Sequence, residues 1–400
     1  MKINTDVKKI EEILTRSIDT VYPTPKEFKE MLSSGKQLRI YMGIDPTATY
    51  VHLGHATNYI ILRRLHDLGH KIIVLIGDFT AMIGDPSDKN AMRKRLTKED
   101  VLANLKTFKE QIGKILDFDN KENPIELRFN SEWLSKLTFE DGINLASHFT
   151  VQRMLERDNF EKRIKENKPL YVHEFFYPLM QGYDSVALEA DVEIGGTDQT
   201  FNMLAGRALV KAYQNREKIV MTTTLLENPV TGEKLMSKSL GTGIGLDEKP
   251  NDMFGKTMAL PDEAIIQVFV DCTYLSMEEI KKMEKELKAG ANPRDLKVKL
   301  AGEIVKMYHG EKAATVAQEY FVKTFCQKEI PDEIPEIKMA DKNILAVLVA
   351  AGFVKSKAEA RRVVQQGGVK VNDQKAESIE LELKSGDVIQ KGSRFFVKIK

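Results

Sequence analysis

A strand–helix–strand pattern near the N-terminus limits the possible folds of this chain more than any other feature. Two short apolar runs rich in Ile and Val, "QLRIYMGI" (37–44) and "KIIVLIGD" (71–78), flank a helical pattern at about 53–68 that ends at Gly69. Two strands joined by a crossover helix pair in parallel. The pattern therefore predicts a βαβ unit and, with it, a parallel sheet.

Further apolar patterns extend this alternation along the chain. They predict strands near 125–130 and 218–224 and helices across 172–190 and 198–214. Repeated strand and helix patterns of this kind are typical of a doubly wound α/β fold. We therefore expect a Rossmann-like catalytic domain with a parallel sheet over residues 1–225.

The rest of the chain divides into three further parts. Helical spacing continues from 261 to 326, so residues 226–328 are expected to combine a basic loop with an all-α domain. Two prolines and several acidic residues in "QKEIPDEIPEIK" make residues 329–339 a linker. Residues 340–400 read as helix, turn, helix and hairpin, which predicts a small α+β domain.

Composition narrows the class of protein. Hydrophobic residues make up 42% and charged residues 30% of the chain, and no long uncharged apolar run occurs, so a soluble protein that does not enter membranes is expected. The N-terminus is charged and lacks the features of a secretory signal. Cys272 and Cys326 lie in apolar helical stretches, where buried free thiols and a cytoplasmic location are expected.

Charge is distributed unevenly. Residues 338–400 carry a net charge of +6 and the rest of the chain −5. A basic module on an acidic body predicts a polyanion as the partner of the C-terminal part.

Two histidines and a glycine stand at the junction between the first strand and its helix. His52, Gly54 and His55 lie in "YVHLGHATNY" (50–59). The start of a helix attracts anions, and the carboxyl end of a parallel strand is where ligands bind. Gly54 would let a ligand approach the backbone, and both histidines could donate hydrogen bonds to phosphate. Taken alone, the motif favours a capped helix with solvated histidines, because short motifs often occur by chance.

A second segment, "KLMSKSLG" (234–241), joins a predicted strand to the helical domain. Its small residues, glycine and lysines are typical of a mobile cationic loop that could fold over a polyphosphate. By itself it would be a flexible basic turn. The two segments together, one on each side of an α/β domain, form a specific combination.

In this combination the chain resembles the class I aminoacyl-tRNA synthetases, whose signatures are a HIGH-like and a KMSKS-like motif, and more closely the bacterial tyrosyl-tRNA synthetases. The resemblance spans nearly the whole chain, and its C-terminal part from residue 340 is similar to the S-four-type RNA-binding domain of such enzymes. It is carried by "YMGIDPTATYVHLGH" (41–55), "MIGDPS" (82–87), "YPLMQGYDS" (177–185) and "EIGGTDQTFN" (193–202).

The residues themselves fit an amino-acid site. Alternation along a strand places Tyr41, Gly43 and Asp45 on one face, with the glycine leaving room for a ligand. On the following helical segment, polar residues are spaced i, i+4, i+7 in an otherwise apolar stretch: Tyr177, Gln181 and Asp184. An exposed polar stripe generally carries Lys and Glu, so these residue types favour a ligand site.

The resemblance implies roles for these side chains. Tyr41 and Asp184 would bond the phenol hydroxyl of tyrosine. Its ammonium group would be held by Asp85, Tyr177 and Gln181, and its carboxylate region by Gln199. The residues implied to bind ATP are Gly43, Asp45, Gly54, Gly196, Asp198 and Lys238. Asp198 would take the ribose hydroxyls, although an Asp after two glycines is also a plausible helix N-cap.

Catalysis would need positioning and charge stabilisation at the phosphates. The residues implied are Thr47, His52, His55, Lys234, Lys238 and Ser239, with Mg²⁺ bound by the nucleotide and no dedicated metal site in the protein. Leu235 stands where the KMSKS-like motif begins with lysine, and Lys234 precedes it by one place.

The implied function is a tyrosine–tRNA ligase that uses ATP, L-tyrosine and tRNA(Tyr) and forms a homodimer. Three alternative functions fit parts of the sequence. A tryptophanyl-tRNA synthetase-like enzyme would not need Tyr41 and Asp184 to receive a phenol. A nucleotidylyltransferase also uses an HxGH helix start, but it would not need the helical domain or the basic tail. A non-catalytic RNA-binding protein on a synthetase scaffold is disfavoured by the intact histidines and Lys238.

Overall fold

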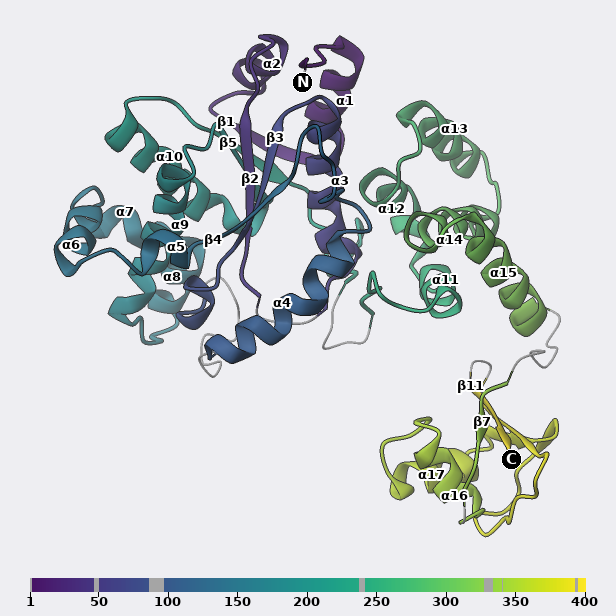
Figure 1. Cartoon of the computed structure of the whole chain (residues 1–400). Coiled ribbons are helices and arrows are strands. Elements are labelled where there is room, and N and C mark those ends of the chain that lie inside the picture. The colour runs from purple at the N-terminus through teal and green to yellow at the C-terminus, as the bar shows by residue number, and fades with distance from the viewer. Residues whose placement is uncertain are drawn as a thin grey trace. The chain divides into compact units, whose positions relative to one another are not determined.

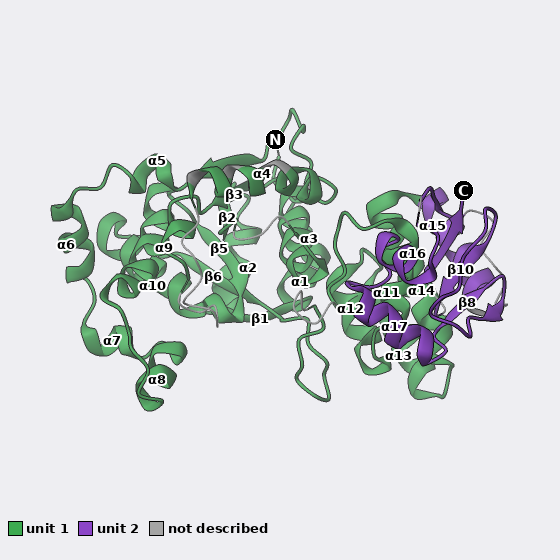
Figure 2. Ribbon diagram, turned by 90° about the horizontal axis from the view of Figure 1, so that it is seen from below, with its two compact units in different colours: residues 1–310 green, residues 311–400 purple. Residues whose placement is uncertain are grey.

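The computed structural model describes residues 2–46, 50–85, 97–236, 242–326, 334–339, 341–392 and 395–400. It contains two compact units, residues 1–310 and 311–400 (Figure 2). Each unit has its own sheet. None of the helices within these described ranges is long and apolar enough to cross a membrane.

The sheet of the first unit confirms the predicted doubly wound α/β fold. Its six strands run in the order β1-β6-β5-β2-β3-β4, with β1 antiparallel to β6 and the other neighbours parallel. The strands are β1 Ile18–Tyr22, β2 Arg39–Ile44, β3 Lys71–Ile76, β4 Glu126–Phe129, β5 Val192–Gly196 and β6 Ile219–Thr223. Strand order reverses between β2 and β5, and ligands of such sheets bind at the carboxyl ends of those strands.

Helices cover both faces of this sheet. Helix α3 (Leu53–Asp67) joins β2 to β3, whereas α9 (Phe176–Ala187) and α10 (Thr200–Gln214) lie on the opposite side (Figure 1). The backbones of α9 and α10 approach closely, because a Cβ atom at Gly182 would stand 2.8 Å from Leu209 Cδ1 and 3.2 Å from the Gly206 nitrogen. Glycine at position 182 thus permits the close approach of α9 to α10.

The remaining helices of the first unit surround this core. Residues 261–310 are largely helical, as their apolar spacing predicts. The helices are α1 Val7–Thr15, α2 Pro25–Ser33, α4 Lys98–Ile112, α5 Ser131–Leu134, α6 Phe139–Ser147, α7 Val151–Leu155, α8 Asp158–Lys165, α11 Pro250–Met258, α12 Ile265–Cys272, α13 Met277–Lys288 and α14 Pro293–His309. Cys272 is buried with a free thiol, as expected.

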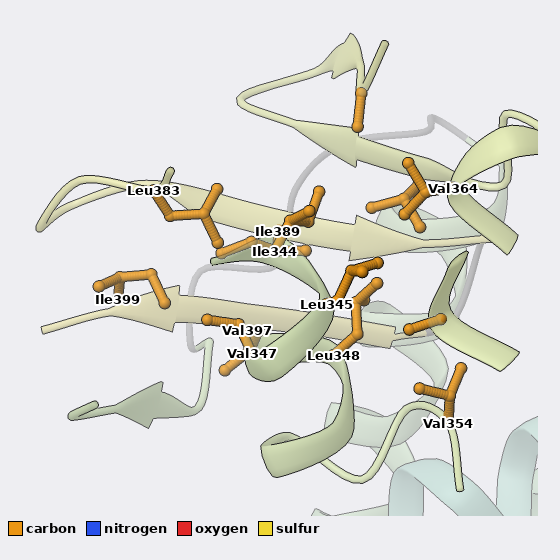
Figure 3. Close-up of a cluster of buried hydrophobic side chains, with 13 residues drawn as sticks. Ile344, Leu345, Val347, Leu348, Val354, Val364, Leu383, Ile389, Val397 and Ile399 are labelled. Atoms are coloured by element: carbon orange, nitrogen blue, oxygen red, sulfur yellow. The ribbon is translucent and has the colours of Figure 1, made fainter. Parts of the chain in front are cut away.

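The second unit begins with helix α15 (Glu311–Phe321) and continues as a small α+β structure. Its sheet has the order β7-β11-β10-β8-β9, and apolar residues of α16 pack against β10 and β11 (Figure 3). The elements are β7 Glu336–Ile337, α16 Ile344–Ala350, α17 Lys357–Gln365, β8 Val369–Val371, β9 Gln374–Lys375, β10 Val388–Lys391 and β11 Phe395–Ile399.

Strand β7 lies in the segment that was expected to be a linker. It pairs in parallel with β11, so this part of the segment belongs to the sheet of the second unit. Its place at the edge explains why a neighbouring proline is tolerated, because an edge strand does not need every backbone donor. The Pro335 carbonyl accepts a hydrogen bond from the Lys398 nitrogen at 2.9 Å.

Candidate active site

The carboxyl end of β2 carries the first group of predicted site residues. Tyr41 is completely buried, and its hydroxyl lies 2.7 Å from Ser185 Oγ on α9. Two residues on, a Cβ atom at Gly43 would meet one described atom within 4 Å, Leu75 Cδ2 at 4.0 Å. Gly43 therefore leaves room above the strand, as a ligand in this position requires.

Asp184 on α9 is held as a hydrogen-bond acceptor. Trp133 Nε1 donates to its Oδ1 at 2.7 Å, and Asn130 Nδ2 donates to its Oδ2 at 3.3 Å. Burial raises the pKa of Asp184 above its usual range, and these two donors oppose that rise. Neither Trp133 nor Asn130 was among the predicted site residues. The one available signal was that Trp133 is the only tryptophan in the chain.

Asp45 joins Tyr177 to the same group. Thr80 Oγ1 donates to Asp45 Oδ1 at 2.7 Å, and the Tyr177 hydroxyl donates to Oδ2 at 2.9 Å. Thr80 Oγ1 in turn accepts from Asn130 Nδ2 at 3.0 Å, which links Asp45 to the surroundings of Asp184. Burial raises the pKa of Asp45 to about 7. Predicted residues from β2 and α9 thus meet in one hydrogen-bonded group.

This arrangement depends on a glycine at the end of β3. A Cβ atom at Gly77 would stand 1.9 Å from Asp45 Oδ1 and 2.4 Å from Thr80 Oγ1. No side chain fits at Gly77 unless the Asp45 carboxyl moves away.

Asp85 and Gln199 form a neighbouring group. Gln199 Nε2 donates to Asp85 Oδ2 at 2.7 Å, and Asn202 Nδ2 donates to Gln199 Oε1 at 2.9 Å. The buried Arg157 donates to Asp85 Oδ1 at 2.8 Å. Arg157 was not among the predicted site residues. Burial is the main cause of the raised pKa of Tyr177 and of Asp45, and the charge of Asp85 raises both further. Asp85 therefore lies within electrostatic range of both side chains.

The two histidines stack at the start of α3. Their ring centroids are 3.8 Å apart with an interplanar angle of 16°. The His52 backbone nitrogen donates to His55 Nδ1 at 3.3 Å, so His55 also helps to close the helix end. Burial lowers the pKa of His52 to about 4 and of His55 to about 3. Both rings are therefore neutral near pH 7, and each has one N–H group to donate.

The segments on either side of residues 237–241 lie against this histidine pair. The Leu53 nitrogen donates to the Ile244 carbonyl at 3.0 Å, and the Leu246 nitrogen donates to the Val51 carbonyl at 2.9 Å. A Cβ atom at Gly54 would stand 3.1 Å from the His52 ring and 3.5 Å from Met236 Cβ. The structure thus brings the neighbours of the two sequence motifs together, although these pairs are between 182 (Gly54 and Met236) and 195 (Val51 and Leu246) positions apart in the chain.

Asp198 and Lys234 are close enough to influence each other. Burial raises the pKa of Asp198, and the charge of Lys234 opposes that rise. Asp198 belongs to a single 3-10 turn, Thr197–Gln199, and the N-cap of α10 is Gln199, so Asp198 is not the N-cap. A Cβ atom at Gly196 would stand 2.7 Å from Asp198 Oδ1, which explains the glycine before it.

Other predicted residues differ in how far the structure describes them. Lys234 is exposed, whereas Leu235 beside it is buried. Thr47, Lys238 and Ser239 lie outside the described residues. Among the residues within the described ranges, no group of three His, Cys, Asp or Glu side chains could hold a metal ion.

The lowered histidine pKa values predict how stability depends on pH. Between about pH 4 and 6.5 the unfolded chain binds protons on His52 and His55 that the folded chain does not bind. These two histidines should therefore lower the midpoint of thermal unfolding as the pH drops from 7 to 4.5. In a His52→Gln/His55→Gln variant the midpoint should fall by less over the same range. The raised pKa of Asp45 acts in the opposite direction. Asp45 is present in the wild-type protein and in the variant, so its effect cancels in the comparison. Equal losses would contradict the prediction.

The fold and this site define a class I aminoacyl-tRNA synthetase. The family model described as tRNA synthetases class I (W and Y) matches residues 33–326. A second model, described as the Tyrosine–tRNA ligase SYY-like C-terminal domain, matches residues 326–397. Within the class, the chain belongs to the tyrosine–tRNA ligase family. These matches confirm the resemblance that the sequence motifs indicated.

Relatives of similar length support this assignment. The chain is 47% identical to the tyrosine–tRNA ligase of Carboxydothermus hydrogenoformans, with 98% of each chain covered. It is 45% identical to that of Haemophilus influenzae, covering 99% of this chain and 98% of the relative. A truncated mitochondrial tyrosyl-tRNA synthetase from Aspergillus nidulans has a similar fold, with a TM-score of 0.68 and 23% identity over 79% of this chain and 94% of that one.

Proposed function

We propose that this chain activates L-tyrosine with ATP, releasing pyrophosphate, and transfers the tyrosyl group to the 3'-terminal adenosine of tRNA(Tyr). The observation that carries this proposal is the setting of Asp184. It is a buried carboxyl, held by Trp133 and Asn130, in the same site as Tyr41 and the open strand position Gly43. A phenol hydroxyl is the side-chain group that such a combination of an acceptor and a hydroxyl fits best.

In the first step, the tyrosine carboxylate would attack the α-phosphorus of ATP and pyrophosphate would leave. The carboxylate is already a nucleophile, so the protein needs to supply position and charge stabilisation and no general base. Tyr41 and Asp184 would bond the phenol, whereas Asp85, Tyr177 and Gln181 would hold the ammonium group. Gln199 would contact the carboxylate region.

The nucleotide would lie beside α3 and the end of β5. Asp198 would bond the ribose, and the glycines at 43, 54 and 196 would allow close approach of the nucleotide, with Asp45 beside them. His52, His55 and Thr47 would meet the phosphates, and Lys234, Lys238 and Ser239 would close over pyrophosphate. Mg²⁺ would accompany ATP and share the charge of its phosphates. The hydrogen bonds from Leu53 to Ile244 and from Leu246 to Val51 support this placement of the KMSKS-like segment.

Domain roles complete the proposal. Residues 1–225 would form the catalytic domain and 226–328 the KMSKS-like loop and anticodon-binding domain. Residues 340–400 would form an S-four-type RNA-binding domain together with β7, which lies within the segment 329–339 first expected to be a linker. The enzyme would act as a homodimer in the cytoplasm. The net charge of +6 on residues 338–400 supports contact with the tRNA backbone.

Exchange of labelled pyrophosphate into ATP tests the proposed function. Exchange should depend on tyrosine, and it should be far weaker with phenylalanine or tryptophan. Tryptophan-dependent exchange would instead indicate a tryptophanyl-tRNA synthetase-like enzyme. Binding of tRNA without exchange for any of these amino acids would indicate an RNA-binding protein without catalytic activity.

The proposed role of the second unit gives a prediction about two arginines. Arg361 and Arg362 are exposed on α17. Reversing both charges, Arg361→Glu/Arg362→Glu, should leave tyrosine activation unchanged but raise the KM for tRNA. The dependence of that KM on salt should also become less steep, because each lost phosphate contact lowers the slope by about one.

A matched control uses two exposed lysines on α1. Lys8→Glu/Lys9→Glu makes the same change in net charge on the first unit. It should affect the KM for tRNA much less than the arginine variant. Equal effects of the two variants would show that net charge alone matters and that α17 has no particular role.

A further inference from the structure

Two charged side chains are buried behind the proposed amino-acid site. Lys218 is completely inaccessible and Glu193 is 1% exposed, and Lys218 Nζ forms an ion pair with Glu193 Oε2. Tyr41 stands opposite Glu193 in the sheet, and Glu193 stands opposite Val220. Lys218 lies two residues before Val220, and residues two apart on a strand share a face. The side chains on this face point towards α9 and α10: Tyr41, Glu193 and Lys218.

A glycine on α10 makes room for this ion pair. A Cβ atom at Gly206 would stand 2.6 Å from Lys218 Nζ and 2.6 Å from Ser185 Oγ. Burial lowers the pKa of Lys218, and the charge of Glu193 opposes that change. A pair that is so costly to bury, with a glycine that accommodates it, calls for an explanation beyond packing.

The ion pair contacts one proposed tyrosine-binding residue, Gln181, directly, and it reaches a second, Tyr41, through Ser185. Glu193 Oε1 accepts from Gln181 Nε2 at 3.1 Å. On the other side, Lys218 Nζ donates to Ser185 Oγ at 2.7 Å, and Ser185 Oγ lies 2.7 Å from the Tyr41 hydroxyl. Ser185 Oγ also lies 3.3 Å from Glu193 Oε2. Glu193 therefore uses one carboxylate oxygen for Gln181 and the other for Lys218.

This division of the two oxygens fixes the orientation of the Gln181 amide. An ionised carboxylate can only accept hydrogen bonds, so Gln181 must present its NH₂ group to Glu193. The carbonyl oxygen of Gln181 is then directed away from Glu193. An ammonium group has only donors, so it can bond Gln181 only through that oxygen.

We propose that Glu193 and Lys218 are positioning residues that keep the carbonyl oxygen of Gln181 turned towards the ammonium group of the substrate. Lys218 acts by pairing with Oε2 of the buried Glu193, which leaves Oε1 to accept from Gln181. The inference rests on the proposed function, in which Gln181 binds the ammonium group of tyrosine.

The substitution Glu193→Gln tests the proposal without a change of shape. Lys218 can only donate, so it would hold the new amide oxygen, and the new NH₂ group would face Gln181. Gln181 would then turn its own oxygen towards residue 193 and its NH₂ group towards the substrate. We expect tyrosine and tyramine, which both carry an ammonium group, to bind about tenfold to a hundredfold more weakly. Binding of 3-(4-hydroxyphenyl)propionate, which lacks the ammonium group, should change less than threefold.

Removing both charges should restore binding. In Lys218→Met/Glu193→Gln, no lysine fixes the new amide, so its oxygen can again accept from Gln181. Tyramine affinity should recover by at least fivefold relative to Glu193→Gln alone, although the double variant has one polar group fewer. A role in stability alone predicts no such recovery.

Calorimetric titration of the full-length protein with the three ligands decides the matter. Glu174→Gln serves as the control, because it neutralises another buried carboxylate, paired with Arg163 at 2.5 Å. In this control, the affinities for tyramine and for the propionate should change to the same extent. If Glu193→Gln does not fold, Lys218→Met/Glu193→Met should also weaken tyramine more than the propionate, because Gln181 then has no acceptor that orients its NH₂ group.

The outcomes distinguish this inference from the proposed function. Wild-type protein that binds neither tyrosine nor tyramine would refute the proposed function, and the inference would fall with it. Suppose instead that the wild-type protein binds both, and that a folded Glu193→Gln or Lys218→Met/Glu193→Met variant weakens all three ligands equally or none of them. That result would overturn the positioning role alone.

Discussion

Asp184→Asn is expected to lower kcat/KM for tyrosine activation by about tenfold to a hundredfold or more, because a hydrogen bond to a charged partner contributes roughly 1.5–3 kcal/mol. Phenylalanine has no hydroxyl to donate, so its kcat/KM should change much less. The preference for tyrosine over phenylalanine should therefore collapse. Selectivity of this kind arises because buried polar groups are left unpaired by the smaller substrate, and the enzyme family assigned here is an established example.

The surroundings of Asp184 define what the substitution does. Trp133 Nε1 has only a donor to offer, so the amide oxygen of the variant should stay at the position of Oδ1, 2.7 Å from that nitrogen. The amide NH₂ group then takes the place of Oδ2, where it faces the Asn130 donor and the proposed phenol. Asp184→Asn thus replaces the acceptor at the position of Oδ2 by a donor, while the shape of the side chain stays the same.

Pyrophosphate exchange with both amino acids measures this effect. Asp271→Asn is a suitable control, because Asp271 is another buried carboxyl of the first unit, 3.3 Å from Thr224 Oγ1. The control should leave the ratio of tyrosine to phenylalanine activation unchanged. An unchanged ratio in folded Asp184→Asn would contradict the assignment of Asp184 to the phenol.

Local patterns were sufficient to predict the part of the fold where the site lies. The strands expected at 37–44 and 71–78 are β2 and β3, and the helix expected at 53–68 is α3, each within a few residues. These elements are predictable because their apolar residues follow the period of the element itself. The helices expected at 172–190 and 198–214 are also present, each preceded by a short 3-10 turn.

Strands β1 and β5 were not predicted, for physical reasons that the structure shows. β5, "VEIGG", contains a glutamate and two glycines, which are uncommon in a central buried strand. The glutamate is tolerated because Lys218, 25 residues further along, neutralises it. β1 is a short edge strand that depends on antiparallel pairing with β6, about 200 residues away. Partners so distant leave no periodic signal in the local sequence.

The same distinction applies to the candidate site. Tyr41, Tyr177 and Asp184 could be proposed because they share a face of their own strand or helix. Trp133, Arg157 and Lys218 could not, because their roles come only from contacts between elements. A polar residue that acts through another residue, as these do, carries no spacing by which the sequence alone would identify it.

The histidine pair gives the second large expected effect. Burial lowers the pKa of His52 to about 4, so near pH 7 the ring is a neutral hydrogen-bond donor and not a cation. His52 Nδ1 is buried and has no hydrogen-bond partner among the described residues. The His52 ring as a whole is half-buried and is held by stacking on His55, so it is suited to meet phosphate charge as it develops in the transition state.

His52→Ala should therefore slow adenylate formation by about a hundredfold to a thousandfold, the usual effect of removing one donor from developing charge. The Kd for tyrosine should change little, because His52 would contact the nucleotide and not the amino acid. His52→Gln, which keeps an amide donor, should recover part of the rate.

His70→Gln is the control, because His70 is also buried and its pKa is also lowered to about 4. Its Nδ1 accepts from the Leu38 nitrogen at the start of β2, away from the proposed site. Single-turnover measurements of adenylate formation separate the rate from tyrosine binding. Weaker tyrosine binding with a normal rate in His52→Ala would place the histidine at the amino acid and contradict its proposed contact with phosphate.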